Sequence, residues 1–470
     1  YDPNYSTLSL VFDVWPGKTT YADVAIVPIT NFIVTPDSGY QSPPVCEVPD
    51  DTPNVLQVSQ PYGTVGSTFT ITGTNFGTVT GTVALAGTPI SVTTWSDTVI
   101  DVTASGVSDG PQQLLVTAAN GNTSPTGLTY HVTDSGGYNP TVIPVGATET
   151  YTTVQSALDA ASNGDLIAVE PGTYYETLIF NKNVKLQGYG PGATVLDGRF
   201  FNFGGLTPQE FISKTQSLTY DGPPDVPMGQ VVTVLAEDGV FDAAYTTQID
   251  GFAIRGGNVA RGNVGPDVTQ QGGGIYAHAY ARWLEVSNNL IQGNSGNGAG
   301  GVILGQAYVT NPDAGDAADS ENDDVHIHHN RVLNNGGFLF GGGIGLFNGA
   351  QDYEIDHNTV CGNYSVTYGG GISHFGVSPG GWIHDNRVLF NGAFDEGGGV
   401  MIAGELPQTT GQVSAGSGDV MVERNLIEGN YSNDDGGGIR MLQPVTGPIT
   451  ITNNMIVNNL ATDAGGGVSV

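Results

Sequence analysis

The chain has few basic residues. Lysine and arginine together number 12, against 45 aspartates and glutamates, so the formal net charge is −33. A polypeptide this acidic repels nucleic acid and anionic membranes, which excludes both as partners. It is also poorly suited to polyanionic glycans unless cations bridge the two charges. A calcium-containing or saline medium would suit such a protein.

Cysteines and long apolar stretches are scarce as well. The two cysteines, Cys46 and Cys361, stand in separate regions, and we predict that they do not pair. No apolar run reaches transmembrane length, so no direct membrane insertion is expected, and no secretory leader is visible. Low lysine and abundant Thr, Ser, Gly and Asn predict a secreted, extracellular or cell-surface protein.

Glycine, by contrast, is abundant and recurs with a period. Glycine triplets end at Gly274, Gly343, Gly371, Gly399, Gly438 and Gly467, with Ala299-Gly300-Gly301 as a variant. The period is about 28 residues once polar inserts at 308–322 and 406–418 are removed. A fixed period predicts a solenoid, in which each repeat buries its apolar face against its neighbours.

The repeats have the pattern of strands. Runs such as 325–328 and 353–356 alternate polar and apolar residues, and no repeat holds a ten-residue helical pattern. Short strands stacked coil on coil predict an all-β fold, a parallel β-helix.

Asparagine recurs twice in each repeat. One series is Asn289, Asn330, Asn358, Asn386, Asn425 and Asn454, and the other is Asn294, Asn335, Asn363, Asn391, Asn430 and Asn459. Asparagine tolerates left-handed backbone geometry, and its amide can bond the same amide one coil away. We predict two structural ladders at tight corners, with the glycines supplying positive φ and close backbone approach at another corner.

The start of the repeat region carries a family resemblance. The segment 151–175, beginning Tyr-Thr-Thr-Val-Gln-Ser-Ala-Leu, continues through Val-Lys-Leu-Gln-Gly at 184–188 and Val-Leu-Asp-Gly at 195–198. It resembles the right-handed parallel β-helix proteins of the pectate-lyase-like superfamily. The resemblance covers about 139–470 and implies a helix at about 152–162 that caps the solenoid. Val154, Ala157, Leu158 and Ala161 lie at helical spacing, which supports that helix independently.

The segment 54–133 is rich in Thr, Val and Gly, with short strands between turn residues, which predicts a β-sandwich. Its Gly-Thr-Asn-Phe-Gly at 73–77 and the neighbouring stretches at 61–66, 95–100 and 114–121 resemble an IPT/TIG domain, an immunoglobulin-like fold. The resemblance is silent on ligand, and a rigid spacer is the favoured interpretation.

The remaining N-terminal segments are short. Residues 1–34 resemble the last hairpin of a carboxypeptidase-regulatory-like β-sandwich, and 35–53 have the composition of a linker. The chain starts with Tyr1 and stops in mid-coil at Val470. We therefore expect a fragment of a longer protein, or coils completed by another chain.

Histidine and aspartate concentrate in three consecutive coils. When the coils are aligned on Ile327, Ile355 and Ile383, polar residues fill the positions around them. They are His328, Asp356 and His384 one position later, His329, His357 and Asp385 two positions later, and His326, Glu354 and Trp382 one position earlier. Stacked strands lie about 4.8 Å apart, so these side chains should form one patch. The patch could act as an acid/base pair or a metal site, although a charge-paired polar ladder is the more common explanation.

Two further kinds of site follow from local patterns. The acid-rich insert ending in Asp319, Glu321, Asp323 and Asp324 offers oxygen ligands for Ca²⁺, the only candidate cofactor, although a solvated loop explains it as well. Glycosylation sequons stand at Asn4, Asn122, Asn363 and Asn430. The last two also belong to a ladder, which should bury their amides.

Catalytic signatures are few. The polygalacturonase-like Gly-His-Gly and Arg-Ile-Lys motifs are absent, and no lysine follows Lys214 to serve as a lyase base. We therefore predict an extracellular structural or adhesive protein, such as a subunit of a filament or surface layer, with self-assembly, other surface proteins or glycans as partners. The alternative is a polysaccharide lyase or glycoside hydrolase acting in the outer groove of the β-helix.

Overall fold

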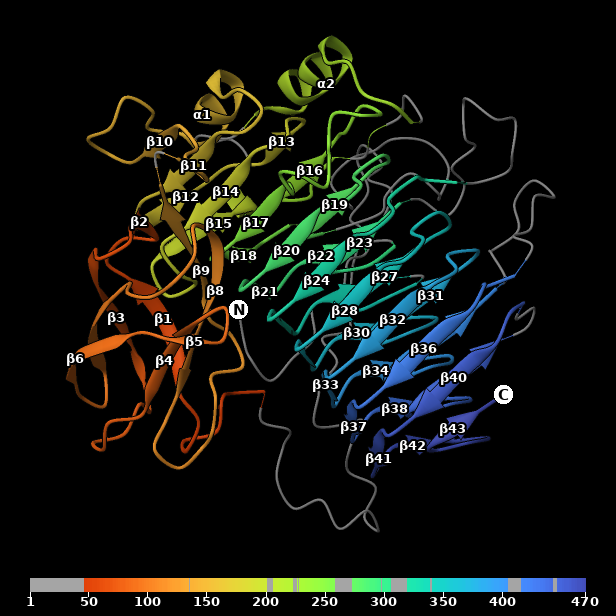
Figure 1. Ribbon diagram of the computed structural model, residues 1–470. Coiled ribbons are helices and arrows are strands. Elements are labelled where there is room, and N and C mark those ends of the chain that lie inside the picture. The colour runs from red at the N-terminus through yellow and green to blue at the C-terminus, as the bar shows by residue number, and fades with distance from the viewer. Residues whose placement is uncertain are drawn as a thin grey trace, which may run out of the picture.

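The computed structural model describes residues 46–470, apart from 135, 201–205, 223–225, 227, 258–272, 297, 306–318, 339, 405–415 and 443–445. The predicted sandwich fragment at 1–34 and the sequon at Asn4 lie outside the described residues. The described chain forms a β-sandwich followed by a parallel β-helix (Figure 1).

The N-terminal sandwich domain consists of two mainly antiparallel sheets. One has the order β1-β3-β7-β6, and the other has the order β2-β9-β8-β4-β5. The strands are β1 (Asn54–Val58), β2 (Tyr62–Thr64), β3 (Thr68–Thr74), β4 (Thr82–Leu85), β5 (Thr88–Pro89), β6 (Ser91–Trp95), β7 (Val99–Thr103), β8 (Gly110–Thr117) and β9 (Leu128–Thr133). Their alternating apolar residues meet in one core around Phe69, Ile71, Val116 and Tyr130.

The β-helix consists of four parallel sheets, here numbered 1 to 4. Sheet 1 contains β10 (Val142–Val145), β11 (Leu166–Val169), β14 (Lys185–Gly188), β17 (Gln248–Asp250), β20 (Glu285–Ser287), β24 (His326–His328), β28 (Glu354–Asp356), β32 (Gly381–His384), β36 (Val420–Glu423) and β40 (Ile449–Thr452). Sheet 2 contains β12 (Gly172–Tyr174), β15 (Thr194–Asp197), β18 (Ala253–Arg255), β21 (Leu290–Gln292), β25 (Arg331–Leu333), β29 (Thr359–Cys361), β33 (Arg387–Leu389), β37 (Leu426–Glu428) and β41 (Met455–Val457).

The other two sheets complete each coil. Sheet 3 contains β13 (Leu178–Phe180), β16 (Val232–Val234), β19 (Ile275–Ala277), β23 (Val302–Leu304), β27 (Ile344–Leu346), β31 (Ile372–Phe375), β35 (Val400–Ala403), β39 (Ile439–Leu442) and β43 (Val468–Ser469). Sheet 4, whose two-residue strands lie between sheets 2 and 3 from the coil of β21 onward, contains β22 (Ser295–Gly296), β26 (Gly336–Gly337), β30 (Tyr364–Ser365), β34 (Gly392–Ala393), β38 (Tyr431–Ser432) and β42 (Leu460–Ala461). The predicted all-β, parallel β-helix architecture is confirmed.

Helices are confined to the first coils in the described part of the chain. Helix α1 (Val154–Ala160) lies within the segment expected to cap the solenoid, and the Thr153 side chain caps its N-terminus. Val154, Ala157 and Leu158 pack into the solenoid core. A short 3₁₀ turn (Gly198–Phe200) and helix α2 (Pro208–Ser217), which begins with a capping box, follow. No helix of the described residues is long and apolar enough to cross a membrane.

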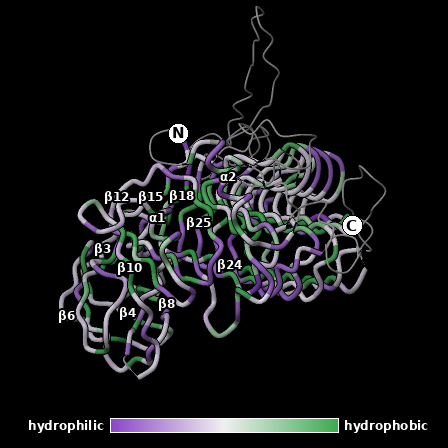
Figure 2. Tube along the Cα trace, turned by 90° about the horizontal axis from the view of Figure 1, so that it is seen from above, coloured by the Kyte–Doolittle hydropathy of each residue, from purple (hydrophilic) through white to green (hydrophobic). Residues whose placement is uncertain are grey.

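The interior of the solenoid is a stack of aliphatic side chains. The middle residue of each sheet 1 strand points inward, so that Val286, Ile327, Ile355, Ile383 and Val422 form one buried column. Figure 2 shows hydrophobic positions of successive coils side by side. The flanking residues of the same strands face outward, which places the polar residues of the repeat on the outer surface.

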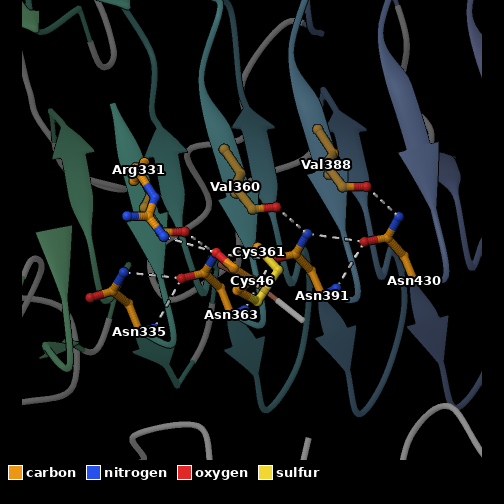
Figure 3. Close-up of a disulfide and its surroundings, with 10 residues drawn as sticks. Cys46, Arg331, Asn335, Val360, Cys361, Asn363, Val388, Asn391 and Asn430 are labelled. Atoms are coloured by element: carbon orange, nitrogen blue, oxygen red, sulfur yellow. Dashed lines mark hydrogen bonds between the residues drawn. A yellow bond between two sulfur atoms is a disulfide. The ribbon is translucent and has the colours of Figure 1, made fainter. Parts of the chain in front are cut away.

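The asparagine ladders are hydrogen-bonded along the whole repeat region. In Asn330, the backbone N–H and Nδ2 both donate to Oδ1 of Asn358 in the next coil, at 2.9 and 3.0 Å. Nδ2 also donates to the Val286 carbonyl of the preceding coil at 2.7 Å. The second ladder repeats this arrangement, as in Asn335, Asn363, Asn391 and Asn430 (Figure 3). One amide therefore satisfies backbone groups of two neighbouring coils at a buried corner.

The expectation that the ladder asparagines themselves adopt left-handed backbone geometry is wrong. Positive φ belongs to the residue before each ladder asparagine, at 288, 329, 357, 385, 424 and 453 and again at 293, 334, 362, 390, 429 and 458. The asparagine itself is needed for its amide. The glycine corner does match its expectation, because Gly369 has φ 68°, and a Cβ on Gly370 would lie 2.4 Å from the Gly392 carbonyl oxygen.

The prediction that the two cysteines do not pair is wrong. Cys46 and Cys361 form a disulfide across a sequence separation of 315 residues. The residues just before the sandwich domain run beside sheet 2, where the Arg331 guanidinium also donates to the Cys46 carbonyl at 3.0 Å (Figure 3). The end of the expected linker is thus fixed to the solenoid rather than free.

The sandwich domain lies against the first coils of sheet 1 through buried polar contacts (Figure 1). The Asp250 carboxylate accepts hydrogen bonds from the backbone N–H and hydroxyl of Thr129 at 3.1 and 2.8 Å. Gln113 and Asn288 exchange two side-chain hydrogen bonds, at 2.7 and 2.9 Å. The domain therefore covers the start of the outer polar face of sheet 1 and leaves the later strands uncovered by these contacts.

Candidate functional site

The candidate site is a strip of polar side chains on the outer face of sheet 1, beyond the sandwich domain. Parallel register places the residues just before the inward-pointing ones in one column, Glu285, His326, Glu354, Trp382 and Met421. The residues just after the inward-pointing ones form a second column, Ser287, His328, Asp356, His384 and Glu423. The corner residues His329, His357, Asp385 and Arg424 form a third. These three columns are called the polar strip below.

The structure brings all nine residues that the aligned coils predicted together in the polar strip. Most of its imidazoles pair with a carboxylate of a neighbouring coil or residue. His328 Nε2 lies 2.9 Å from Glu285 Oε1, and His384 Nε2 lies 2.8 Å from Glu354 Oε1. His384 Nδ1 lies 2.8 Å from Asp385 Oδ2, which also accepts a hydrogen bond from Arg424. Each of these pairs joins residues of different columns, so an alignment of equivalent positions in successive coils does not reveal it.

Asp356 is the centre of the network. Its Oδ1 lies 2.5 Å from His326 Nε2, and its Oδ2 lies 2.5 Å from His357 Nδ1. Burial alone would raise the pKa of this carboxyl, but the two imidazoles lower it well below its usual range. The same contacts raise the pKa of His326, against its burial, and of His357. Asp356 is therefore a carboxylate near neutral pH, suited to bind cations or stabilise positive charge, and unsuited to donate a proton.

His329 has a different environment. Its ring stacks on that of His357 with centroids 4.8 Å apart and an interplanar angle of 1°, and its Nδ1 lies 2.9 Å from His328 Nδ1. Burial, together with the charges of these two neighbouring histidines, lowers the pKa of His329 to about 3. This imidazole is therefore neutral near pH 7, with nitrogen lone-pair capacity for a metal ion or a proton donor.

Glu285 is a charged member of the polar strip that the repeat alignment did not include. Burial opposes its ionisation, but the hydrogen bond and charge of His328 and the charge of Lys185 outweigh it and lower the pKa to about 2. Its signal was present in the sequence, because Val286 occupies the position of Ile327 one coil earlier. The insert at 308–322 separates the two coils and hid the match.

Next to the strip, the surface is hollowed by about 430 Å³. The lining includes Trp382, Met421, Asp419, Pro448 and Thr450, which lie at or just before the beginning of β32, β36 and β40. Trp382 is half-buried, its ring centroid lies 3.7 Å from that of His384, and Met421 is 40% exposed. The hollow therefore combines an aromatic and an apolar wall with the adjacent imidazoles and carboxylates.

The aromatic residues of the glycine-rich loop before β27 differ in exposure. Phe338 is 38% exposed, but Phe340 is buried. Phe340 packs with Tyr276, Phe347 and Phe375 in a separate apolar cluster against sheet 3. These rings are unavailable to a ligand, so Trp382 is the aromatic residue that lies with the polar strip.

The proposed calcium ligands are arranged around an arginine. Arg282 Nη2 pairs with Glu321, and Arg282 Nε lies 3.6 Å from Asp323 Oδ2. Burial is the main cause that raises the pKa of Asp323 to about 6. Asp319 accepts a hydrogen bond from the Glu321 backbone N–H, and Asp324 adopts a positive φ of 55°. The guanidinium occupies the position where an ion would approach Glu321 and Asp323, so calcium binding here stays a prediction.

The sequons differ in accessibility. Asn363 and Asn430 are 1% and 0% exposed, and their Nδ2 atoms donate within the second ladder. Attachment of a glycan to either nitrogen would break that ladder. Asn122 is half-buried, and its Nδ2 donates to the Asp51 carbonyl at 3.0 Å.

Comparison with known proteins identifies the N-terminal domain. Residues 45–132 match the model of the IPT/TIG domain family. No curated protein sequence matches the chain.

Three solved structures illustrate the similarities to known proteins. A gamma-CGTase from an alkalophilic Bacillus clarkii is 30% identical over 22% of this chain and 16% of its own length, with a TM-score of 0.18. A pectin methylesterase from Aspergillus niger is 13% identical over 71% of this chain and 88% of its own, with a TM-score of 0.32. A family 28 exopolygalacturonase from Yersinia enterocolitica is 12% identical over 89% of both chains, with a TM-score of 0.27. By the family model that matches residues 45–132 and by the topology of its sheets, the described chain is an IPT/TIG domain docked on a parallel β-helix.

Proposed function

We propose that this chain binds saccharides on the outer face of sheet 1, at the polar strip and the Trp382 hollow. The observation that carries the proposal is the position of Trp382, which lines a hollow of about 430 Å³ and contacts His384 of the strip. A sugar ring presents apolar C–H groups on its faces and hydroxyls around its edge. An aromatic wall beside carboxylates and imidazoles offers partners for both.

The charge of the chain favours neutral saccharides. The hollow includes Asp419, and Glu354 and Glu423 lie on the adjoining strands. With a net charge of −33, the protein repels uronates and sulfated sugars. Neutral hexoses have no such penalty, and their hydroxyls can donate to the carboxylates.

Isothermal titration with a panel of neutral oligosaccharides tests the proposal. We expect saturable binding that is weakened about 10-fold in Trp382→Ala, because aromatic contacts contribute about 0.5–1.5 kcal/mol beyond the area they bury. Phe394→Ala is the matched control, since this aromatic is 57% exposed on a different side of the coil, after β34. The absence of saturable binding to every sugar, or equal losses in both variants, would refute the proposal.

Cleavage of the bound saccharide is a second candidate, favoured by one feature. Single ligand atoms of His326, Glu354 and Asp356 lie within 4.8 Å of one another, so the two carboxylates are close to the spacing of about 5–5.5 Å used by retaining glycosidases. In this scheme Glu354, with a side chain 37% exposed, is the acid and Asp356 the nucleophile. We expect Glu354→Gln to remove any turnover while Glu428→Gln, on sheet 2, leaves it unchanged. Lack of product from any sugar that binds would eliminate this candidate.

The disulfide supports an extracellular location. Disulfides persist in oxidising compartments and are rare in the cytosol, and Cys46–Cys361 joins two distant parts of this chain. A cell-surface position, with a structural or adhesive role and partners among surface proteins or copies of this chain, remains the prediction made from the sequence. Saccharide binding is compatible with adhesion and gives it a chemical basis.

A further inference from the structure

A set of metal-ligand side chains lies at the corner of two consecutive coils. His329 and His357 occupy equivalent corner positions, with φ of 52° and 53°, and their rings are parallel at 4.8 Å. Asp356 precedes His357 and turns its Oδ2 toward the His357 ring. One ligand atom from each of these three residues lies within 4.8 Å of the other two. Two imidazoles and one carboxylate therefore converge on one point of the surface.

The ligand types favour a transition metal over calcium. Zn²⁺ and its neighbours are bound by imidazole and carboxylate, and a set of two histidines and one carboxylate leaves coordination positions open. Calcium takes six to eight oxygen ligands, which this corner does not supply. Ligand atoms around a tetrahedral Zn²⁺ at about 2.0–2.2 Å are about 3.3–3.6 Å apart. Side-chain rotations can bring the three ligand atoms, which now lie within 4.8 Å of one another, to this separation.

Neighbouring side chains hold the three ligands in place. Asp356 Oδ1 is fixed by His326 Nε2 at 2.5 Å, which leaves Oδ2 for the corner. His328 Nδ1 lies 2.9 Å from His329 Nδ1, and His328 Nε2 in turn lies 2.9 Å from Glu285. Partners of this kind set the tautomer and orientation of metal-binding imidazoles and carboxylates. The side chain of His357 is 51% exposed, so an ion can reach the corner from solvent.

We propose that His329, Asp356 and His357 form a binding site for one divalent transition-metal ion of the zinc class. The ion takes the place of the hydrogen bond between His357 Nδ1 and Asp356 Oδ2, and the neutral His357 ring then carries its proton on Nε2. None of its three ligands lines the Trp382 hollow, although all three belong to the polar strip that we propose binds saccharides. The site also differs from the calcium ligands predicted at Asp319, Glu321, Asp323 and Asp324.

The chain supplies its own conservative substitution for the test. Asn288 and Asn453 occupy the same corner position in other coils with φ of 55° each. The changes His329→Asn and His357→Asn therefore remove imidazoles while keeping a residue that this corner accommodates. Asp385→Asn is the matched control, because Asp385 holds the corner of the next coil but is outside the ligand set.

The experiment is titration of the chelator-treated, full-length chain with Zn²⁺ alone, followed by substitution with Co²⁺. We expect one equivalent of Zn²⁺ to bind, and Co²⁺ to give the visible absorption of a low-coordinate site. Binding should weaken at least tenfold in each corner variant and stay unchanged in Asp385→Asn. Circular dichroism and melting temperature of the metal-free variants show whether they are folded.

Three results would overturn the proposal. The first is the absence of saturable Zn²⁺ binding by the wild-type chain. The second is unchanged binding in the His329→Asn, His357→Asn double variant, which would place the ion elsewhere, for instance at Asp434, Asp435 and Asp463, another converging set of ligands. The third is loss of binding in Glu354→Gln with retention in the double variant, which would assign the ion to His326, Glu354 and Asp356. Saccharide titration of the same samples shows separately whether the proposed function fails.

Discussion

Replacement of Asn358 by alanine should strongly destabilise the solenoid. The amide of Asn358 makes five hydrogen bonds at a site that is 1% exposed. Its Nδ2 donates to the carbonyls of Ile327 and Asp356 and to Asn386 Oδ1, at 2.8, 2.9 and 3.0 Å. Its Oδ1 accepts from the backbone N–H and the Nδ2 of Asn330, at 2.9 and 3.0 Å.

The magnitude follows from the groups left behind. Without Oδ1, the buried N–H of Asn330 loses its acceptor, which costs about 1–3 kcal/mol, and each further neutral hydrogen bond lost costs about 1 kcal/mol. Several partners keep other bonds, so we expect Asn358→Ala to lower the free energy of unfolding by about 3–5 kcal/mol. A loss of this size is a large part of the stability of an ordinary domain.

The same ladder provides the control. Asn454 makes equivalent bonds to Asn425 and to the Val422 carbonyl, but it is half-exposed, so water can replace much of what alanine removes. We expect Asn454→Ala to cost about 1–2 kcal/mol. Urea unfolding followed by circular dichroism measures both values. Equal losses, or a loss below about 1 kcal/mol for Asn358→Ala, would refute the view that buried amides hold the coils together.

Two other predictions concern buried ionisable groups. Thr129, Gln187, Ser287 and Asn288 all donate hydrogen bonds to the Asp250 carboxylate. Asp250→Asn, whose amide places a donor among donors, should therefore loosen the domain interface and raise hydrogen exchange at Thr129; unchanged protection would contradict this. His374 is fully buried, and burial lowers its pKa to about 4. A histidine in the unfolded chain titrates near pH 6.5, so between pH 4 and 6.5 the unfolded chain binds more protons than the folded chain. The contribution of His374 to the free energy of unfolding is therefore complete above about pH 6.5 and falls by up to about 3 kcal/mol as the pH drops toward 4. Denaturant unfolding of the wild type and His374→Gln from pH 4 to 7 measures the difference between their free energies of unfolding. This difference should shrink on acidification, and pH curves of the two proteins that stay parallel would contradict the assignment.

Periodicity made much of this fold predictable. The 28-residue repeat, the alternation around Ile327, Ile355 and Ile383, and the recurring asparagines are local patterns that a stack of coils translates directly into space. The polar strip could be assembled on paper for the same reason, because equivalent residues in successive coils must lie next to one another.

The remaining features depend on contacts that the repeat does not encode. Nothing in the spacing of Cys46 and Cys361 shows that the segment before the sandwich domain runs beside sheet 2. The diagonal pairing of His384 with Glu354 depends on rotamers rather than register. The corner positive φ falls on residues as different as His329 and Arg424, so residue type alone does not mark it.

The Cys46–Cys361 bond changes how the IPT/TIG domain can move. The domain is joined to the solenoid by the main chain after β9 and by the disulfide before β1, so it is anchored at both ends. If the polar contacts at Asp250 open, the domain stays close to its seat, and reclosure is an intramolecular event at high effective concentration. Reduction removes one anchor and leaves the domain on a single hinge. The redox state of one bond thus sets how far the domain can swing away from the outer face of sheet 1.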